Sequence, residues 1–376
     1  MRARLIYSSN FFIACALGVV FVFLDDVQVA NNLDDWHVGV IAGSGFGAAL
    51  VAQLVVSPLA DRGRVLPLAI VALGSSILGT VGFAFGGSMA ELAVSRGVAG
   101  IGFGIFALVA RKALIGLDAT GSGAKLGLLL STAVAGFILG PVIGAILEPL
   151  GFEVPFLSVA GAIAVVGVPA VIAIARSDIA ASDDVDYSDL SELIRRPRIQ
   201  AAMLVTVIVL GSNGALTATV DRFLTDLGAS TTMVAIVILF IGAPLLVLPR
   251  VSGGLAEQRG GSAVMLPALA VFVPVMFGYG LAGSVLAVVI FGVIHGSGES
   301  FGSIAAQVLV LEVTGPERAA VGSALLEVSG LLAATLAASI APIMYGEFGQ
   351  SVYIGTGTIG LALGLLAVQR VRNAWD

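Results

Sequence analysis

Long apolar runs, separated by short polar or glycine- and proline-containing breaks, cover nearly the whole chain. The runs are apolar on every face rather than amphipathic, which is typical of buried or lipid-embedded helices. Most hold about 20 residues, the length that a helix needs to cross about 30 Å of hydrocarbon. The first run is too long for a cleavable signal peptide, and no small-residue cleavage site follows it. The pattern predicts twelve spans, at residues 8–29, 38–59, 66–85, 89–114, 126–147, 155–175, 199–223, 232–248, 263–281, 285–311, 319–345 and 352–371.

Basic residues predict the orientation of these spans, because cytoplasmic loops carry an excess of Lys and Arg. With the N-terminus inside, sixteen of the 18 basic residues fall at cytoplasmic positions, while Arg222 lies outside and Arg96 lies within the fourth span. The opposite orientation would place nearly all of them outside. We therefore expect a multi-pass protein of the cell membrane, with an even number of spans and both termini in the cytoplasm.

Composition excludes several classes of function. Hydrophobic residues make up 58% of the 376 residues and charged residues only 11%, against about 25% charged in soluble domains, which excludes an ordinary cytosolic enzyme. Cys15 is the single cysteine and there are two histidines, so we expect no disulfide and no metal site. The net charge of −6 offers no basic face for nucleic acid. The chain also lacks a phosphate-binding loop, a nucleophile elbow and a metal signature, so we expect a non-enzymatic protein without a cofactor. We also expect it to be a monomer in the lipid bilayer.

An internal repeat with an offset near 195 residues divides the chain. It predicts two six-helix halves, 1–175 and 199–376, joined by a cytoplasmic linker at 176–198. Transporters often have such halves, with the substrate site near the midplane between them. Five matches carry the repeat: Asp25 with Asp221, Leu59-Ala60-Asp61 with Leu255-Ala256-Glu257, Gly97-Val98 with Gly292-Val293, Gly127 with Gly322, and Pro141 with Pro342.

The linker begins with acidic residues, continues as a short helix-like stretch at 188–194 and ends in Arg195-Arg196-Pro197-Arg198. We interpret it as a solvated connection with a basic anchor on the cytoplasmic side. A partner-binding or regulatory role is the alternative.

The break after the second span reads SPLADRGR, at 57–64, and the matching break in the second half reads GGLAEQRGG, at 253–261. Both resemble the cytoplasmic signature of the major facilitator superfamily, Gly-x-Leu-Ala-Asp-Arg-x-Gly-Arg. Ser57 replaces the first glycine, one residue is missing before Gly63, and Gln258 replaces the usual arginine. The resemblance implies an all-α polytopic membrane protein with twelve helices in two pseudo-symmetric halves.

A gating latch is expected at this signature. Asp61 ends the second span at the cytoplasmic face, where the eleventh span begins near Arg318. A carboxylate beside a helix N-terminus is stabilised by roughly 0.3–1 kcal/mol, and this contact exists only when the two halves are closed on the inside. A plain solvated turn is the alternative. The candidate latch residues are Asp61, Arg62, Arg64, Glu257 and Arg259.

Two further motifs suggest a proton-coupling pair. Span four reads SRGVAGIG, at 95–102, and is similar to the superfamily's Arg-x-x-x-Gly-x-Gly element. Arg96 lies roughly 10 Å below the outer end of that span, a depth at which an arginine must be paired or hydrated. LDDVQVANNL, at 24–33, resembles the superfamily's first-helix element, with Asp25 in the acidic position and no proline after it. We expect Asp25 to pair with Arg96; the alternative is that Asp25 lies in an exposed outer loop.

Span five reads GFILGPVIG, at 136–144, and resembles the element that is typical of drug:proton antiporters within the superfamily. Gly136, Gly140, Pro141 and Gly144 match it. Small residues at four-residue spacing allow close helix approach, and the proline breaks one backbone hydrogen bond and permits a bend. Helix packing without any role in efflux is the alternative.

Acidic residues in the second half provide other proton-coupling candidates. His295 and Glu299 are four residues apart in span ten and share a helix face, and Glu327 lies within span eleven. Intramembrane acids face the bundle interior or a wet cavity, and a histidine beside a glutamate forms a pH-sensitive pair. Buried polar contacts between helices are the alternative. The candidates for a neutral polar cavity are Asn10, Gln53, Asn213, Thr217 and Gln307.

These features predict a secondary active transporter that exports a small organic molecule by alternating access, driven by protons. Moving one charge across 100 mV releases about 2.3 kcal/mol, enough for a roughly fiftyfold gradient at about 1.4 kcal/mol per decade, so no ATP site is required. A proton-coupled uptake carrier for a small metabolite is one alternative, and a transporter-like sensor that binds its ligand without moving it is another. The element in span five favours efflux over uptake.

The predicted orientation is testable by cysteine labelling. A cysteine placed at Gly121 or Ser182 should react with a membrane-impermeant maleimide only from the cytoplasmic side, because both positions fall in cytoplasmic loops. A cysteine at Asp34 should react only from outside. Labelling of the Ser182 position from outside would contradict the predicted topology.

Overall fold

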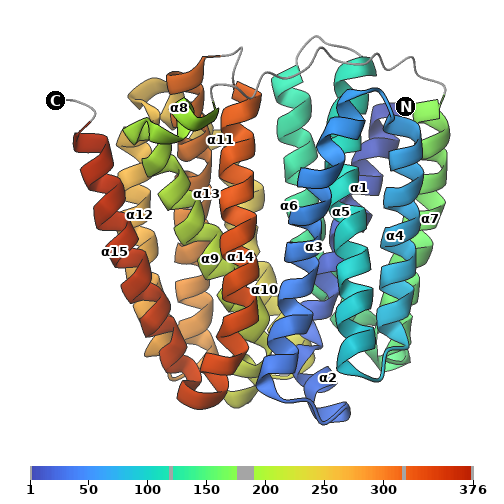
Figure 1. Cartoon of the computed structure of the whole chain (residues 1–376). Helices are drawn as coiled ribbons and strands as arrows, with labels where there is room; N and C mark the ends of the chain where they lie inside the picture. Colours follow the sequence, from blue (N-terminus) through green and yellow to red (C-terminus); the bar gives the residue numbers. More distant parts are fainter. Residues whose placement is uncertain (1, 118–121, 176–189, 316–318, 374–376) are drawn as a thin grey trace. The chain divides into compact units, whose positions relative to one another are not determined.

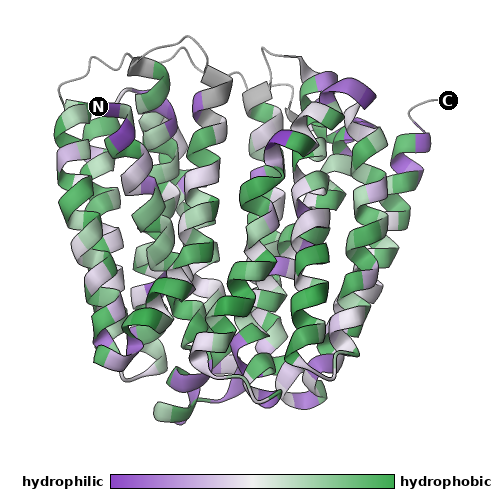
Figure 2. Cartoon of the chain, turned by 180° about the vertical axis from the view of Figure 1, so that it is seen from behind, coloured by the Kyte–Doolittle hydropathy of each residue, from purple (hydrophilic) through white to green (hydrophobic). Residues whose placement is uncertain are grey.

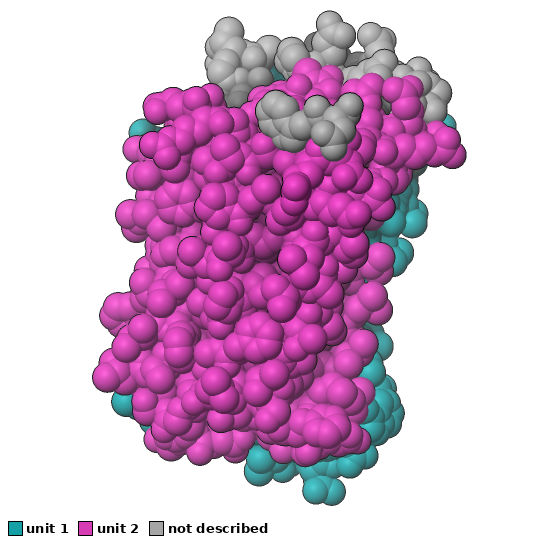
Figure 3. Space-filling view, turned by 90° about the vertical axis from the view of Figure 1, so that its left-hand side faces the viewer, with its two compact units in different colours: residues 1–185, 230–235 teal, residues 186–229, 236–376 magenta. Residues whose placement is uncertain are grey.

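The computed structural model describes residues 2–117, 122–175, 190–315 and 319–373, and every regular element in these ranges is a helix (Figure 1). Hydrophobic residues run along the helices, and hydrophilic residues gather mainly at their ends (Figure 2). The chain divides into two compact units (Figure 3). Unit 1 contains Met1–Val185 and Ser230–Ala235, and unit 2 contains Asp186–Ala229 and Ile236–Asp376.

Unit 1 is built from long helices around an apolar core that includes Phe106, Val109 and Ile163. Its elements are α1 (Arg2–Gly18), the 3₁₀ segment η1 (Val19–Val22), α2 (Leu24–Ala30), α3 (Asp35–Asp61), α4 (Val65–Ala84), α5 (Met89–Leu117), α6 (Ser122–Leu147), η2 (Glu148–Leu150) and α7 (Glu153–Ala175).

Unit 2 begins with a short helix, α8 (Leu190–Arg195), which overlaps the helix-like stretch predicted at 188–194. The rest of the predicted linker, 176–189, lies outside the described residues. The helices that follow are α9 (Pro197–Asp226), α10 (Thr231–Val247), whose first residues belong to unit 1, α11 (Pro249–Arg259), α12 (Gly261–Gly280), α13 (Val285–Thr314), α14 (Ala319–Phe348) and, after η3 (Gly349–Ser351), α15 (Val352–Arg372).

The described helices agree with the predicted fold class. Ten segments are long and apolar enough to cross a membrane, or eleven when α10 and α11, bent by 43° at their junction, count as one span. The segment Val321–Arg372 contains two helices, α14 and α15. Counting these two separately makes the number of spans consistent with twelve.

The first span is shorter than predicted. It ends at Val22, and α2 starts as a separate helix at Leu24 after a non-helical Phe23. Asp25 therefore does not lie in the outer half of the first span, and the predicted range 8–29 is wrong at this end. Adjacent carboxylates are costly in hydrocarbon, and the break moves Asp25 and Asp26 into the first turn of a short helix of their own.

Much of each of the two signature motifs, predicted as breaks between spans, is helical in the structure. α3 continues through the first copy as far as Asp61, and α11 contains most of the second copy, ending at Arg259. Pro249 occupies the first turn of α11, where its missing N–H costs nothing. The bend before α11 thus coincides with a residue that fits the start of a helix and removes a backbone hydrogen bond from the helix before it.

Helix packing follows the same order in both units. In unit 1, α1 packs on α5, α6 and α7, and α4 packs on α5 and α7. In unit 2, α9 packs on α13, α14 and α15, and α12 packs on α13 and α15. A six-helix half that occurs twice produces this correspondence. The division into halves at 1–175 and 199–376 stays a prediction.

Glycines let α1 and α6 approach until their backbones touch. A Cβ added at Gly140 would lie 2.7 Å from both the carbonyl oxygen of Cys15 and the amide nitrogen of Val19. A Cβ at Gly136 would collide with the carbonyl oxygen of Phe11, and one at Gly18 with that of Phe137. The predicted close approach at the span-five motif is therefore a contact between α6 and α1.

We expect Gly140→Ala to lower the melting temperature of the purified protein by a few degrees, because overpacking a tight contact costs about 1–3 kcal/mol. Gly127→Ala on the same helix is the matched control, since nothing lies within 4 Å of a Cβ there. Alanine is favoured over glycine in a helix by about 1 kcal/mol, so the control should keep or raise the melting temperature. Equal melting temperatures for the two variants would contradict the close contact.

Candidate functional site

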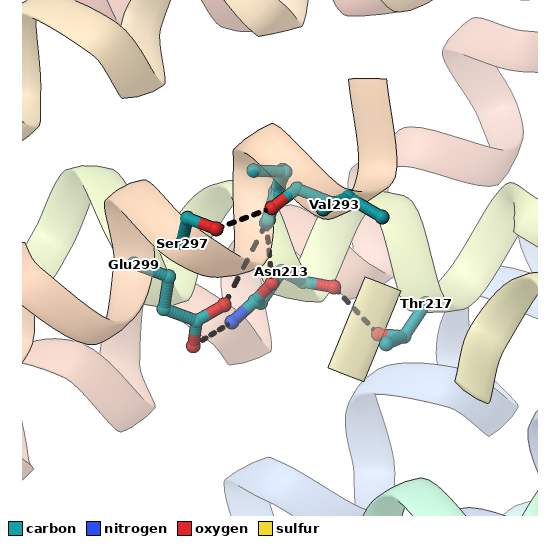
Figure 4. A network of polar contacts seen from close by, with 6 residues as sticks. Asn213, Thr217, Val293, Ser297 and Glu299 are labelled. Carbon is teal, nitrogen blue, oxygen red and sulfur yellow. Dashed lines mark hydrogen bonds and ion pairs between the residues drawn. The ribbon is translucent and has the colours of Figure 1, made fainter. Parts of the chain in front are cut away.

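A buried polar network in unit 2 joins α9 to α13 (Figure 4). Asn213 Nδ2 donates a hydrogen bond to Glu299 Oε1 at 2.6 Å, and His295 Nε2 lies 3.0 Å from Asn213 Oδ1. The same histidine nitrogen is 3.7 Å from Glu299 Oε2. His295 is 0% exposed and Glu299 is 7% exposed. The predicted pair on span ten therefore forms one site together with Asn213, which was predicted separately as a cavity residue.

The amide of Asn213 determines which histidine nitrogen carries hydrogen. Because Nδ2 of Asn213 donates to Glu299, it is the oxygen Oδ1 that faces His295 and accepts. His295 Nε2 must then be protonated, and Nδ1 of a neutral ring is left as an acceptor. Nδ1 is buried and has no hydrogen-bond partner among the described residues.

The His295–Glu299 pair has zero net charge when it holds one proton, whether as imidazole with carboxylic acid or as imidazolium with carboxylate. Losing that proton leaves a lone carboxylate in a buried site, which is costly without a cationic partner. Protonation of Glu299 at Oε2 still leaves Oε1 free to accept from Asn213. The site can therefore take up and release a proton without losing its hydrogen bond to α9.

Aromatic rings on α12 enclose the imidazole of His295. The ring centroid of Phe272 lies 4.6 Å from that of His295, and the ring centroid of Tyr279 lies 5.8 Å from it. On the α9 side, the hydroxyl of Thr217 donates to the carbonyl oxygen of Asn213 at 2.7 Å. Asn213 and Thr217 are half-buried, so the amide side of the site is more accessible than the imidazole side.

The candidate site in unit 1 contains a buried cation. Arg96 on α5 is 2% exposed, and its NH1 donates to the carbonyl oxygen of Leu17 at 2.8 Å. The guanidinium carbon lies 4.4 Å from the centroid of the Phe21 ring, a cation–π contact. Arg96 Nε is buried and has no hydrogen-bond partner among the described residues. The partners of this cation in the described part of the chain are thus neutral groups of α1 and η1.

The predicted pairing of Asp25 with Arg96 does not occur in this structure, since the Asp25 carboxylate is not among the partners of Arg96. Asp25 lies in the first turn of α2, which follows η1 and the non-helical Phe23, eight residues beyond Leu17. Next to it, partial burial and then the carboxylates of Glu148 and Asp25 raise the pKa of Asp26. Asp25 and Asp26 of α2 are thus grouped with Glu148 of η2 rather than with Arg96.

Other candidates for the polar cavity differ in their surroundings. Asn10 is 2% exposed and binds α6, donating to the carbonyl oxygen of Leu129 at 2.8 Å and to the hydroxyl of Thr132 at 3.1 Å. Gln53 on α3 is 7% exposed. On the other unit, Gln307 on α13 is exposed. Asn10 thus ties two helices together in this structure, while Gln53 and Gln307 remain cavity candidates.

The remaining acidic and basic candidates are spread over several helices. Glu327 is half-buried on α14. Among the latch residues, Arg62, Arg64, Glu257 and Arg259 are exposed at or next to the ends of α3 and α11. The side chain of Asp61 and the whole of Arg318 lie outside the described residues. The latch therefore stays a prediction.

An open hollow of about 270 Å³ lies in unit 1, lined by residues of α1 and α6. Three aromatic residues, Tyr7, Phe11 and Phe12, line it together with Ser8 and Thr132. The rings of Phe11 and Phe12 meet edge to face at 5.0 Å between centroids. The residues of this hollow were not singled out in the sequence, because aromatic positions in an apolar span carry no distinguishing pattern.

Unit 2 also contains buried polar residues that were not among the candidate site residues from the sequence. Asp221 on α9 is 5% exposed, and its position within the predicted seventh span was the signal that could have identified it as an intramembrane acid. Tyr353 on α15 shares a 2.8 Å hydrogen bond with the hydroxyl of Thr219. Tyrosines in an apolar run give no such signal, since they are counted with the hydrophobic residues.

A sequence model of the Major Facilitator Superfamily matches residues 6–285 of this chain. The chain therefore belongs to the Major Facilitator Superfamily, and it is a membrane transporter of that type. None of the curated proteins compared with it matches.

Solved transporter structures share the fold. A bacterial homologue of the human lysosomal transporter Spinster, in an inward-facing and occupied conformation, has a TM-score of 0.77 at 14% identity over 99% of this chain and 96% of its own. A mutant of the nucleoside transporter NupG has a TM-score of 0.77 at 15% identity over 98% of this chain and 100% of its own. A D-xylose-proton symporter has a TM-score of 0.77 at 13% identity over 97% of this chain and 96% of its own.

We expect Arg96→Met to remain folded, with an unchanged or higher melting temperature, and to lose transport. Replacing a buried charge by an apolar side chain of similar length is often neutral or stabilising, while the contact to the α1 backbone is lost. Arg370→Met, at an exposed position of α15, is the control and should leave both properties unchanged. An Arg96→Met protein with normal counterflow in proteoliposomes would show that the buried cation has no part in transport.

Proposed function

We propose that this transporter is a proton-coupled exporter of a small organic molecule, with the His295–Glu299 pair as its proton carrier. The observation that carries the proposal is the buried network of His295, Asn213 and Glu299, in which the two titratable groups have no other charged partner in the described hydrogen bonds and ion pairs. A site of this kind holds one proton at little cost and loses it only when water or substrate solvates the remaining carboxylate.

The proton cycle follows from this charge balance. With the site closed to water, the pair keeps its proton and is neutral. When the amide side opens to the cytoplasm, where protons are scarce, water solvates Glu299 and the proton leaves. The carboxylate that remains can bind a cationic or hydrogen-bond-donating substrate in place of the proton. Reprotonation from the outside then expels the substrate, so that one proton moves in for each molecule that moves out.

Outward direction rests on the span-five element rather than on the proton site. Its glycines and Pro141 lie on α6 and pack against α1, so the motif belongs to a tight helix pair within unit 1. In the superfamily this element is typical of antiporters, which supports efflux.

Asp25 and Arg96 are the competing proposal for the coupling site. The contacts of Arg96 are with neutral groups of α1 and η1, which supports the unit 2 site over this pair. For these two residues to act together, Asp25 would have to move toward Arg96 in another conformation. Glu299 needs no such movement to reach its partners, and we therefore prefer it as the carrier. The latch at Asp61 and Glu257, and Glu327 as a third carboxyl candidate, stay part of the proposal.

We expect Glu299→Gln to abolish pumping driven by a pH gradient in proteoliposomes while leaving substrate exchange intact, because the variant keeps the hydrogen bond to Asn213 but holds no exchangeable proton. A screen of labelled organic compounds under an imposed pH gradient supplies the substrate. Asp25→Asn should leave pumping intact if Glu299 is the carrier. Glu347→Gln, at an exposed position of α14, is the control for a neutralised carboxylate.

The outcomes separate the candidate functions. Normal pumping by Glu299→Gln would overturn the proposed carrier, and loss of pumping in Asp25→Asn alone would move the coupling site to unit 1. Pumping in the inward direction by the unmodified protein would identify an uptake carrier. Binding of a compound without counterflow would identify a sensor.

A further inference from the structure

Two buried polar atoms of unit 2, on neighbouring aromatic rings, have no hydrogen-bond partner among the described residues. One is His295 Nδ1, which the hydrogen bonds of Asn213 leave as an acceptor. The other is the hydroxyl of Tyr279 on α12, which can donate. The two ring centroids are 5.8 Å apart, and both side chains are 0% exposed. A buried donor and a buried acceptor left unsatisfied on neighbouring rings are a usual setting of a buried water molecule.

Tyr279 also belongs to a chain of aromatic residues that leads to the end of α9. Its ring centroid lies 5.7 Å from that of Tyr353, whose ring centroid lies 6.5 Å from that of Tyr345. The hydroxyl of Tyr353 shares a 2.8 Å hydrogen bond with Thr219, and that of Tyr345 donates to Asp226 Oδ2 at 2.8 Å. The hydroxyls of Tyr353 and Tyr345 are thus each hydrogen-bonded to a side chain of α9, the first to a hydroxyl and the second to a carboxylate.

The chain connects the surface to the buried site. Asp226 is the last residue of α9 and is exposed. Asn213 lies about 20 Å from it at 1.5 Å per residue along the same helix. Thr219 lies between these two levels. Tyrosine hydroxyls thus contact α9 at two levels, Asp226 and Thr219, and the ring of Tyr279 continues the series from Tyr353 to His295.

We propose that these residues form a proton path through unit 2, from Asp226 to Glu299, in which Tyr279 and a buried water deliver the proton to His295 Nδ1. The proposal rests on the proposed function, in which Glu299 is the proton carrier. It adds the route by which the proton arrives and a positioning role for Tyr279, which none of the motifs in the sequence contains.

The transfer at His295 conserves protons. The bridging water gives a proton to Nδ1, and His295 becomes an imidazolium. The water regains a proton from the hydroxyl of Tyr279, and Tyr279 regains one from the outer side of the path. The Nε2–H of the imidazolium then turns from Asn213 Oδ1, at 3.0 Å, to Glu299 Oε2, at 3.7 Å, and its proton passes to that oxygen. The neutral imidazole that remains holds hydrogen on Nδ1 and lacks its hydrogen bond to Asn213 until Nε2 is protonated again. The titratable side chains placed against His295 are Glu299 on its own helix and Tyr279 on α12, while α9 contributes the neutral Asn213.

The test follows the protonation of Glu299 directly and requires no substrate. The full chain in lipid nanodiscs is subjected to a rapid pH drop, and the carboxylic acid C=O stretching band is recorded by time-resolved infrared spectroscopy. The band that disappears in Glu299→Gln belongs to Glu299. In Tyr279→Phe we expect the same band to rise at least about 10²-fold more slowly. A positioned proton-transfer group contributes about 10²–10⁴-fold to a rate.

Tyr279→Phe keeps the aromatic contacts and removes a hydroxyl that has no hydrogen bond within the described residues, so we expect the variant to fold normally. Tyr7→Phe in unit 1 is the matched control and should show the rate of the unmodified protein. An unchanged rate in Tyr279→Phe would overturn the path and leave the proposed function standing. If no band is lost in Glu299→Gln, then Glu299 does not take up the proton, and both the path and the proposed carrier are overturned.

Discussion

A polar side chain buried in a membrane-spanning helix must find its hydrogen-bond partners inside the protein, because lipid offers none. This constraint accounts for most of the specific contacts described above. Asn10 crosses from α1 to α6, Arg96 binds the backbone of α1, and Asn213 joins α9 to α13. Each of these contacts connects helices that are far apart in sequence. The polar residues thereby specify which apolar helices are neighbours, a choice that hydrophobic burial alone leaves open.

The two units satisfy the same constraint with different chemistry. In unit 1 the buried charge is a guanidinium that stays protonated, and a carbonyl oxygen and an aromatic face stabilise it. In unit 2 the buried groups are a carboxyl and an imidazole, which can be neutral together. A permanent charge is suited to binding or positioning, and a titratable pair is suited to exchange with protons. Helices of the same packing order therefore support two different tasks.

The sequence predicted the helices well because length and uniform hydrophobicity are sufficient to identify a span. It predicted His295 and Glu299 as neighbours because four-residue spacing places them on one helix face. It did not predict the partner of Arg96, since the choice between Asp25 and the carbonyl oxygen of Leu17 depends on where the first span ends. That end is decided by a single non-helical residue, Phe23, inside an apolar stretch. Tyr279 was missed because its importance lies in what surrounds its hydroxyl, and no spacing rule contains that information.

The partners of Arg96 have a consequence for how unit 1 senses its surroundings. Neither a backbone carbonyl nor a phenyl ring gains or loses a proton, so acidification leaves this contact as it is. The contact changes only when the segment Leu17–Phe21 itself is displaced, at the point where α1 passes into the 3₁₀ segment η1. The glycines of α6 continue along this segment, since Gly140 meets Val19 and Gly144 meets Val22, so a displacement of η1 must also change its contact with α6. The surroundings of Arg96 therefore depend on the position of the first helix, whereas those of Glu299 depend on its protonation.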